Sequence, residues 1–342
     1  MKSWLKALVR RVIGPSGLRT IAAGTAAALS LAAGGAEAAD VLVRVSTAAP
    51  PADFLARSLE VLKAEVEKAN VSLRVEPHPA STLFKQGTEV PALQRGNLEM
   101  STMTTFEVAQ QIPEYGLFNR AYLFRDYAQM HAVFDGPIGA EYRQTVAQKM
   151  GIQILATAYL GTRQLALRQK RTVSGPADLA GIKLRMPAGP EWLLLGQTLG
   201  VSPVPMGMPE VYLALKTGAI DGQENPLSIF NAAKLYEVSE QVVLTSHMVQ
   251  PVFFSIAAKF YDGLSPQQKS VLRAAAASAA TANDAGRLDD EKKIAEALRT
   301  RGLAVDAIDL APFRALSDKV YAQAADTKSW DMALARRVAA TK

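Results

Sequence analysis

Short stretches in which apolar and polar residues alternate are separated by stretches in which apolar residues recur every three or four positions. Residues 41–46 (VLVRVS) and 71–76 (VSLRVE) alternate and predict strands, whereas residues 52–69 have the apolar spacing of a helix. A short helix is expected at residues 90–94 and a strand at residues 98–102. This order of strands and helices is typical of an α/β domain with a mostly parallel sheet.

A second pattern of the same kind begins near residue 152. Apolar runs predict further strands at residues 152–160, 164–168, 182–186, 219–222, 252–257 and 303–305. Helices are expected at residues 192–199 and in the segment that Gly218 ends. A long helix begins at Ser265-Pro266, which suit the N-cap and the first turn, and continues to about Arg301.

The first forty residues have a different composition from the rest. Five basic residues precede an apolar run from residue 21 to about residue 33, and Ala36-Glu37-Ala38 follows as a small-x-small pattern. We predict a signal peptide at residues 1–38, with cleavage after Ala38 and a periplasmic location. The apolar run is shorter than the roughly 20 residues that a membrane span needs, so we expect no direct membrane insertion.

The charge balance argues against a nucleic-acid partner. The 342 residues have a net charge of +6, but residues 1–38 hold five of the 38 Lys and Arg and one of the 32 Asp and Glu. The remaining chain is therefore near +2, with 33 basic and 31 acidic residues. The sequence has no cysteine, which excludes disulfides, thiolate metal sites and cysteine nucleophiles.

Motifs for catalysis, metals and cofactors are absent from the sequence. The three histidines, His78, His131 and His247, form no H-x-x-H or H-E-x-x-H pair. There is no G-x-S-x-G, no G-x-G-x-x-G and no phosphate-binding loop. We therefore expect no enzyme activity, no catalytic residues, no metal site and no cofactor.

Cationic and amide side chains come at the ends of predicted strands. Arg163 follows the strand at residues 152–160, Arg185 ends the strand IKLRM, and Asn225 follows the short strand before it. Ligands of α/β proteins bind outside the carboxyl ends of strands. A guanidinium matches a carboxylate with two parallel hydrogen bonds. These residues favour capture of an organic anion, although each alone is also compatible with a solvated strand end or a turn.

Residues 181–227, GIKLRMPAGPEWLLLGQTLGVSPVPMGMPEVYLALKTGAIDGQENPL, resemble the core signature of the DctP-like solute-binding proteins of tripartite ATP-independent periplasmic (TRAP) transporters. The segments GTRQ (161–164), LTSH (244–247) and GLSPQQKSVL (263–272) extend the resemblance. It implies an α/β, two-domain periplasmic binding protein fold with a ligand cleft between the domains and a long interdomain helix. The expected domains are residues 39–160 plus 251–290 and residues 161–250 plus 291–342.

The resemblance also implies roles for individual residues. Arg185 matches the arginine that holds the ligand carboxylate, Asn225 a ligand-contacting asparagine, and Arg163 a second arginine at the cleft. Met208 stands where some members have an aromatic residue over the ligand. Thr104 stands where some sugar-acid binders have a glutamate, which argues against a ligand of the sialic-acid type.

Further lining residues are expected around these five. The segment TLFKQG replaces the QLG loop of the family, so Lys85 and Gln86 enter the wall of the first domain, where Lys85 is suited to a second carboxylate. Ser46 and Thr47 follow the first strand and are expected to line the cleft. Trp192 and Phe230 are expected either on the second-domain side of the cleft or in the core.

The expected function is that of a monomeric periplasmic receptor that binds a small organic acid and delivers it to the small and large TRAP membrane subunits. The available cations favour a C4-dicarboxylate or a related hydroxy or keto acid. Two other classes of protein stay open at this point. One is a ligand sensor that docks a signalling receptor, and the other is a periplasmic enzyme acting on an organic acid.

Overall fold

A computed structural model describes residues 40–342, and residues 41–342 form one compact unit. The predicted signal peptide lies outside the described residues. The strands of this unit are β1 (Val41–Ser46), β2 (Leu73–His78), β3 (Met100–Met103), β4 (Ile152–Leu167), β5 (Lys183–Met186), β6 (Ser202–Pro205), β7 (Gly222–Pro226), β8 (Gln241–Ala257) and β9 (Ala304–Ala307).

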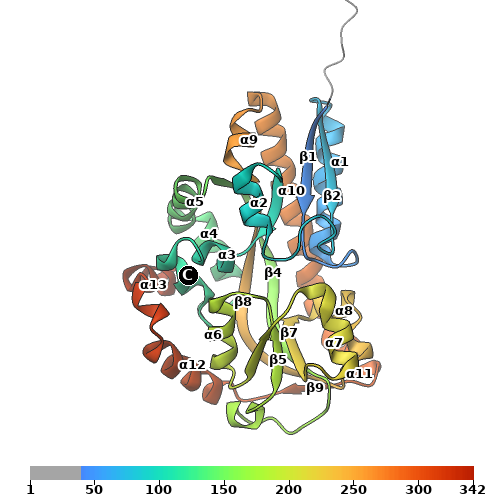
Figure 1. Cartoon of the computed structure of the whole chain (residues 1–342), viewed down its shortest axis with the longest axis vertical. Coiled ribbons are helices and arrows are strands. Elements are labelled where there is room, and N and C mark those ends of the chain that lie inside the picture. Colours follow the sequence, from blue (N-terminus) through green and yellow to red (C-terminus); the bar gives the residue numbers. More distant parts are fainter. Residues whose placement is uncertain (1–39) are drawn as a thin grey trace, which may run out of the picture. The chain divides into compact units, whose positions relative to one another are not determined.

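The helices of the unit cover the sheet (Figure 1). They are α1 (Phe54–Ala69), α2 (Glu89–Arg95), α3 (Thr105–Ala109), α4 (Tyr127–Asp135), α5 (Pro137–Met150), α6 (Pro190–Thr198), α7 (Val211–Thr217), α8 (Leu227–Ala232), α9 (Ala258–Asp262), α10 (Pro266–Glu291), α11 (Ile294–Thr300), α12 (Ala311–Gln323) and α13 (Met332–Ala340). Short 3-10 turns lie at Pro113–Asn119, Pro176–Leu179, Met208–Glu210, Leu235–Glu237 and Asp326–Ser329.

All nine strands of residues 40–342 join one sheet in the order β2-β1-β3-β8-β4-β7-β5-β6, with β9 paired to β8. The sheet is mixed: of its eight strand pairings within these residues, five are parallel, as expected, and three are antiparallel. β1 pairs in parallel with β2 and β3, and β5 with β6 and β7. Between these two parallel groups, β4 and β8 run antiparallel to each other and to their neighbours β7 and β3. The strand–helix–strand pattern predicts only the outer groups correctly.

β4 and β8 are the longest strands described, with 16 and 17 residues. The sequence predicts two strands where β4 is continuous, because a glycine at position 161 usually ends a strand. In the structure Gly161 has φ 125° and lies where the pairing of β4 with β8 shifts register, but the strand continues. Pro251 is expected just before a strand but lies inside β8. It is tolerated because β3 pairs with residues 253–256 and β9 with residues 241–244, so no second strand pairs with β8 at Pro251.

β7 also differs from the prediction. Gly218 ends α7 in the left-handed conformation, at φ 75°, as expected, but the strand begins at Gly222 rather than at residue 219. Asn225 therefore lies within β7, opposite Gln164 of β4, and not in a loop after the strand. The same holds for Arg163, which lies within β4.

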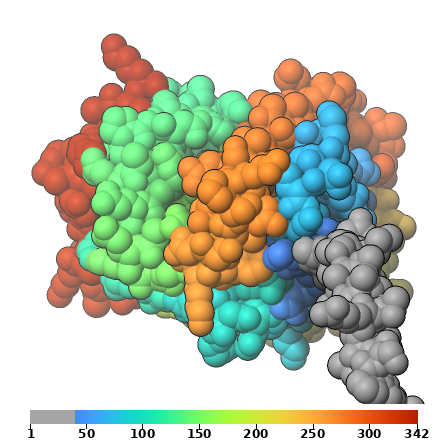
Figure 2. Space-filling model, turned by 90° about the horizontal axis from the view of Figure 1, so that it is seen from above, coloured from blue at the N-terminus to red at the C-terminus, as the bar shows by residue number. Residues whose placement is uncertain are grey.

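The long helix α10 connects distant parts of the unit. Ser265 caps its first turn as predicted, but it ends at Glu291, and α11 is a separate helix. Seen from one end of the unit, the orange segment of α9 and the start of α10 lies between the green residues of α5 and the blue residues of α1 (Figure 2). α10 packs against α1 and against β4. The expected boundaries of two domains within this unit stay a prediction.

Candidate ligand site

A small cavity lies where the predicted site residues meet. Its volume is about 80 Å³. Its polar lining consists of Thr47, Gln86, Glu89, Thr102, Thr104, Glu107, Arg163, Arg185, Asn225 and Gln250. Its apolar lining includes Leu55, Leu160, Trp192, Met208, Ile229 and Val252. The wall therefore suits a small polar solute with an apolar side.

Arg185 of β5 is the principal cation of this cavity. The residue is 1% exposed, and its guanidinium donates to the Met206 carbonyl at 2.8 Å and to Gln86 Oε1 at 3.0 Å. None of the ion pairs found within residues 40–342 includes Arg185. Burial lowers the pKa of Arg185 to about 9, because a charge is poorly solvated there and the carboxylates of Glu224 and Glu210 offset this effect only in part. The guanidinium is therefore prepared for an anionic ligand.

Arg163 of β4 has its anion already. Its Nη2 donates to Glu224 Oε1 at 2.6 Å, its Nε donates to Glu224 Oε2, and its Nη1 donates to Gln250 Oε1 at 2.7 Å. Glu224 also accepts from His247 Nε2 at 3.1 Å. Burial alone would raise the pKa of Glu224, but the charge of Arg163 and these hydrogen bonds lower it. Burial lowers the pKa of His247.

Asn225 of β7 faces the same cavity and forms hydrogen bonds to one cationic and one neutral side chain. Its Oδ1 accepts from Arg163 Nη2 at 3.1 Å, and its Nδ2 donates to Gln223 Oε1 at 2.6 Å. Met208 Sδ lies 3.8 Å from this Nδ2 and 3.9 Å from Arg185 Nη1. Asn225 is thus connected to Arg163 directly and to Arg185 through Met208. Met208 places a flexible thioether at the position where some family members have an aromatic residue over the ligand.

Trp192 of α6 forms the aromatic wall. Its ring stacks on Phe106 with centroids 3.5 Å apart and an interplanar angle of 7°. The guanidinium carbon of Arg163 lies 4.8 Å from the centroid of the Trp192 ring. These contacts fix the plane of the indole and hold the arginine against it.

Two glutamates line the cavity that sequence reasoning missed. Glu107 Oε2 accepts from the Thr104 backbone N–H at 2.9 Å and from the Thr104 hydroxyl, which completes a capping box at the start of α3. Glu89 Oε2 accepts from the Gly87 N–H at 2.7 Å. Burial raises the pKa of both carboxyls, that of Glu89 to about 7. The T-x-x-E spacing of Thr104 and Glu107 predicts a capping box, but it gives no sign that the carboxyl faces a cavity.

Eight of the predicted site residues line the cavity: Arg185, Asn225, Arg163, Met208, Thr104, Gln86, Thr47 and Trp192. The other three do not. Lys85 is exposed on its loop, Ser46 is fully buried beside Thr47 but does not line the cavity, and Phe230 packs in the hydrophobic core behind it. In each case a residue next to it in the chain lines the cavity instead, namely Gln86, Thr47 and Ile229.

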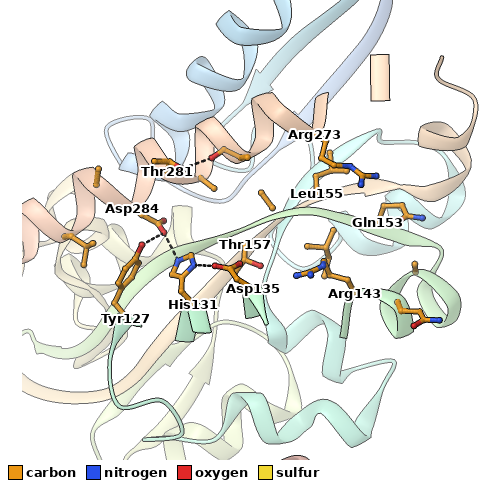
Figure 3. A pocket seen from close by; sticks show the side chains of 18 of the residues that line it. Tyr127, His131, Asp135, Arg143, Gln153, Leu155, Thr157, Arg273, Thr281 and Asp284 are labelled. Carbon is orange, nitrogen blue, oxygen red and sulfur yellow. Dashed lines mark hydrogen bonds and ion pairs between the residues drawn. The ribbon is translucent and has the colours of Figure 1, made fainter. Parts of the chain in front are cut away.

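A larger groove lies elsewhere on the described chain, between α4, α5, β4 and α10 (Figure 3). Its volume is about 1090 Å³. His131 bridges Asp135 at 2.9 Å and Asp284 at 2.8 Å, and the Tyr127 hydroxyl donates to Asp284 at 3.3 Å. His131, Asp135 and Asp284 thus satisfy one another. The arginines that line the groove, Arg143 and Arg273, are half-buried and exposed, so the groove lacks the unpaired buried cation that distinguishes the smaller cavity.

Across residues 40–342, no cluster of three or more His, Asp or Glu side chains is arranged to hold a metal ion. Within the same range, no helix combines the length and the apolar character needed to cross a bilayer.

Comparison with known proteins agrees with this geometry. The family model of the bacterial extracellular solute-binding proteins of family 7, DctP, matches residues 45–328. A solute-binding protein of Verminephrobacter eiseniae is 32% identical over 288 residues, which cover 84% of this chain and 85% of that protein.

Solved structures show the same fold. A TRAP periplasmic solute-binding protein from Roseobacter denitrificans, with bound 3-deoxy-D-manno-oct-2-ulosonic acid, is 36% identical with a TM-score of 0.85, over 89% of this chain and 100% of that chain. One from Bordetella bronchispeptica, with density interpreted as pantoate, is 30% identical with a TM-score of 0.81, over 89% and 100%. The expected α/β fold of two-domain TRAP solute-binding proteins is thereby confirmed. The chain belongs to the bacterial extracellular solute-binding proteins of family 7, as a DctP-like protein of the TRAP type.

Proposed function

We propose that this protein is a periplasmic receptor that binds a small organic acid through Arg185 and delivers it to TRAP membrane subunits. One observation carries the proposal: a fully buried guanidinium lines the cavity without a carboxylate partner among residues 40–342. An unpaired buried charge is costly, and an incoming carboxylate removes that cost. The contact is charge-assisted and stronger in the desolvated cavity than in water.

The number of free cations bears on the class of acid. A C4-dicarboxylate, the ligand first expected, needs a cation for each end. Arg163 is neutralised by Glu224, and Lys85 does not line the cavity. One carboxylate on Arg185, with hydroxyl groups toward the remaining polar wall, is the arrangement that these contacts favour. The acids in the two related structures, 3-deoxy-D-manno-oct-2-ulosonic acid and pantoate, likewise carry one carboxylate and two or more hydroxyls.

The proposed division into two domains gives this site a way to open. Gln86 belongs to the first proposed domain, whereas Arg185 and Met208 belong to the second. Gln86 Oε1 accepts from Arg185 Nη2 at 3.0 Å and from the Met208 N–H at 2.9 Å. Separation of the domains would break these contacts and admit the ligand, and closure would restore them.

A thermal-shift screen tests the function. The chain from residue 39 onward is screened against monocarboxylic hydroxy acids, keto acids, C4-dicarboxylates and neutral sugars. A ligand at 100 times its dissociation constant adds about 2.7 kcal/mol to the free energy of unfolding. We expect hydroxy acids to raise the melting temperature and neutral sugars to leave it unchanged. Stabilisation by neutral sugars alone would contradict the proposal. Release of a chemically altered acid would favour an enzyme instead.

A further inference from the structure

The ligand cavity is lined by two carboxyls as well as by the cation Arg185. Glu89 belongs to α2 and Glu107 to α3, whereas Arg185 belongs to β5. All three side chains line the same cavity. Gln86, which accepts from Arg185, directly precedes Gly87, which donates to Glu89.

The two carboxyls lie near each other and have no cation. After burial, the charge of Glu107 contributes to the raised pKa of Glu89. Neither carboxyl takes part in any of the ion pairs found within residues 40–342. A carboxyl pair without a cation is a poor neighbour for a second anion, because it offers that anion no positive charge and repels it whenever either carboxyl is ionised.

Each carboxyl uses one oxygen for local structure. Glu107 Oε2 accepts from Thr104 and Glu89 Oε2 accepts from the Gly87 N–H. The Oε1 atom of each carboxyl has no hydrogen bond to the described residues. Neither Oε1 atom is among the fully buried, unsatisfied polar atoms of residues 40–342. Both carboxyls line the cavity, so these oxygens are available to a solute. A free carboxyl oxygen accepts a hydrogen bond from a hydroxyl group.

We infer that Glu89 and Glu107 set the specificity of the cavity: they bind hydroxyl groups of the ligand and reject a second carboxylate. This inference rests on the proposed function, since Arg185 must hold the first carboxylate. The ligand class is then a hydroxy acid with one terminal carboxylate and a hydroxylated tail. A dicarboxylate of the same length would bring its second charge into the cavity that these two carboxyls line.

Matched pairs of acids test this inference by calorimetry. D-erythronate and meso-tartrate share a four-carbon chain and differ at one end, which is a CH₂OH group or a carboxylate. D-galactonate and galactarate form the same pair with six carbons. The pair to be compared is the one whose monocarboxylate binds the wild type more tightly. Within that pair, we expect the wild type to bind the monocarboxylate at least tenfold more tightly than the dicarboxylate. In the Glu89→Gln/Glu107→Gln variant, we expect this ratio to fall below about threefold, chiefly because the dicarboxylate binds more tightly.

Two controls make the outcome decisive. Glutamine also completes a capping box with Thr104, so Glu107→Gln keeps the start of α3, and Glu60→Gln removes an exposed carboxyl of α1. Glu60→Gln should keep the wild-type ratio. An unchanged ratio in the double variant would overturn the inference. If Arg185→Met still abolished binding in that case, the proposed function would stand. Absence of binding of all four acids to the wild type would overturn both.

Discussion

Arg163 and Glu224 form a buried ion pair between neighbouring strands, with side chains 3% and 0% exposed. Arg163 Nη2 donates both to Glu224 Oε1 at 2.6 Å and to the Glu224 carbonyl at 2.8 Å. The pair connects β4 to β7 beside the cavity and leaves Arg185 as the cation without an anion. A pair of this kind is a structural support for the site, and its loss should affect the whole fold.

Glu224→Gln should lower the free energy of unfolding by about 3 kcal/mol or more, because it leaves the buried Arg163 charge without an anion. Urea unfolding at neutral pH measures this loss. The double variant Arg163→Met/Glu224→Leu should recover most of it, since apolar replacement of a buried pair is often neutral. Glu60→Gln, on the exposed face of α1, should have no effect. A loss below about 1 kcal/mol in Glu224→Gln would show that the pair does not stabilise the sheet.

Arg185→Met should separate binding from stability. The change removes a buried charge whose pKa is lowered to about 9, so the melting temperature of the unliganded protein should stay the same or rise. Affinity for the acid should fall at least tenfold, because a charge-assisted bidentate contact contributes roughly 1.5–3 kcal/mol. Thermal unfolding and calorimetry measure the two effects. Arg336→Met, at an exposed position of α13, serves as control. Unchanged affinity in Arg185→Met would remove Arg185 from the site.

The sequence predicts the outer parts of the sheet better than its centre. The strands β1, β2 and β5 follow alternating or apolar runs closed by glycine or proline, and local patterns are sufficient for them. β4 and β8 contain Gly161 and Pro251, which are usual strand breakers, and only long-range pairing accommodates them. The prediction of a break is reasonable locally, but tertiary pairing outweighs local propensity.

The site is predicted in a similar way. Arg185, Asn225 and Arg163 can be found because they stand near predicted strand ends in segments that resemble the family signature. Glu89 and Glu107 are missed because each has a sufficient local role, near the start of a helix. Which face of a short helix meets a cavity depends on packing between segments far apart in the chain, and no spacing within the sequence encodes it.

Glu89→Gln should change the pH dependence of stability. Burial raises the folded-state pKa of Glu89 from about 4.5 to about 7. Between these values the folded protein holds a proton that the unfolded chain has lost, so the free energy of unfolding falls as the pH rises through this window. The loss is at most about 3 kcal/mol. Glu89→Gln should be more stable than the wild type at pH 8 and similar to it near pH 4.5, as urea unfolding can measure. Equal stabilities at pH 8 would contradict the assignment.

His131→Gln should show the opposite dependence. Burial alone would lower the pKa of His131, but hydrogen bonds to Asp284 and Asp135 raise it above its ordinary value. The stability that the charged imidazole contributes is therefore complete below about pH 6.5 and lost as the pH rises through the folded-state pKa. We expect His131→Gln to cost about 1 kcal/mol more at pH 6 than at pH 9. A cost that does not vary with pH would show that the imidazole acts only by packing in the groove of Figure 3.

Gln86 lies at the boundary between the ligand cavity and a second, more open cavity of about 640 Å³. Its Oε1 accepts from Arg185 and from the Met208 N–H. Gln86→Ala removes both hydrogen bonds, so the ligand should leave about tenfold faster while its association rate changes little.

Gln86→Glu gives the sharper test. It places a carboxylate 3.0 Å from the Arg185 guanidinium, where it would compete with the carboxylate of the ligand. The unliganded protein should become more stable, because the buried guanidinium gains an anion, while affinity for the acid falls at least tenfold. Stopped-flow fluorescence and thermal unfolding measure the two effects. Gln110→Ala, which changes only the outer cavity, should leave both unchanged. If Gln86→Glu bound the acid as tightly as the wild type, Gln86 would not be in contact with the anion-binding position.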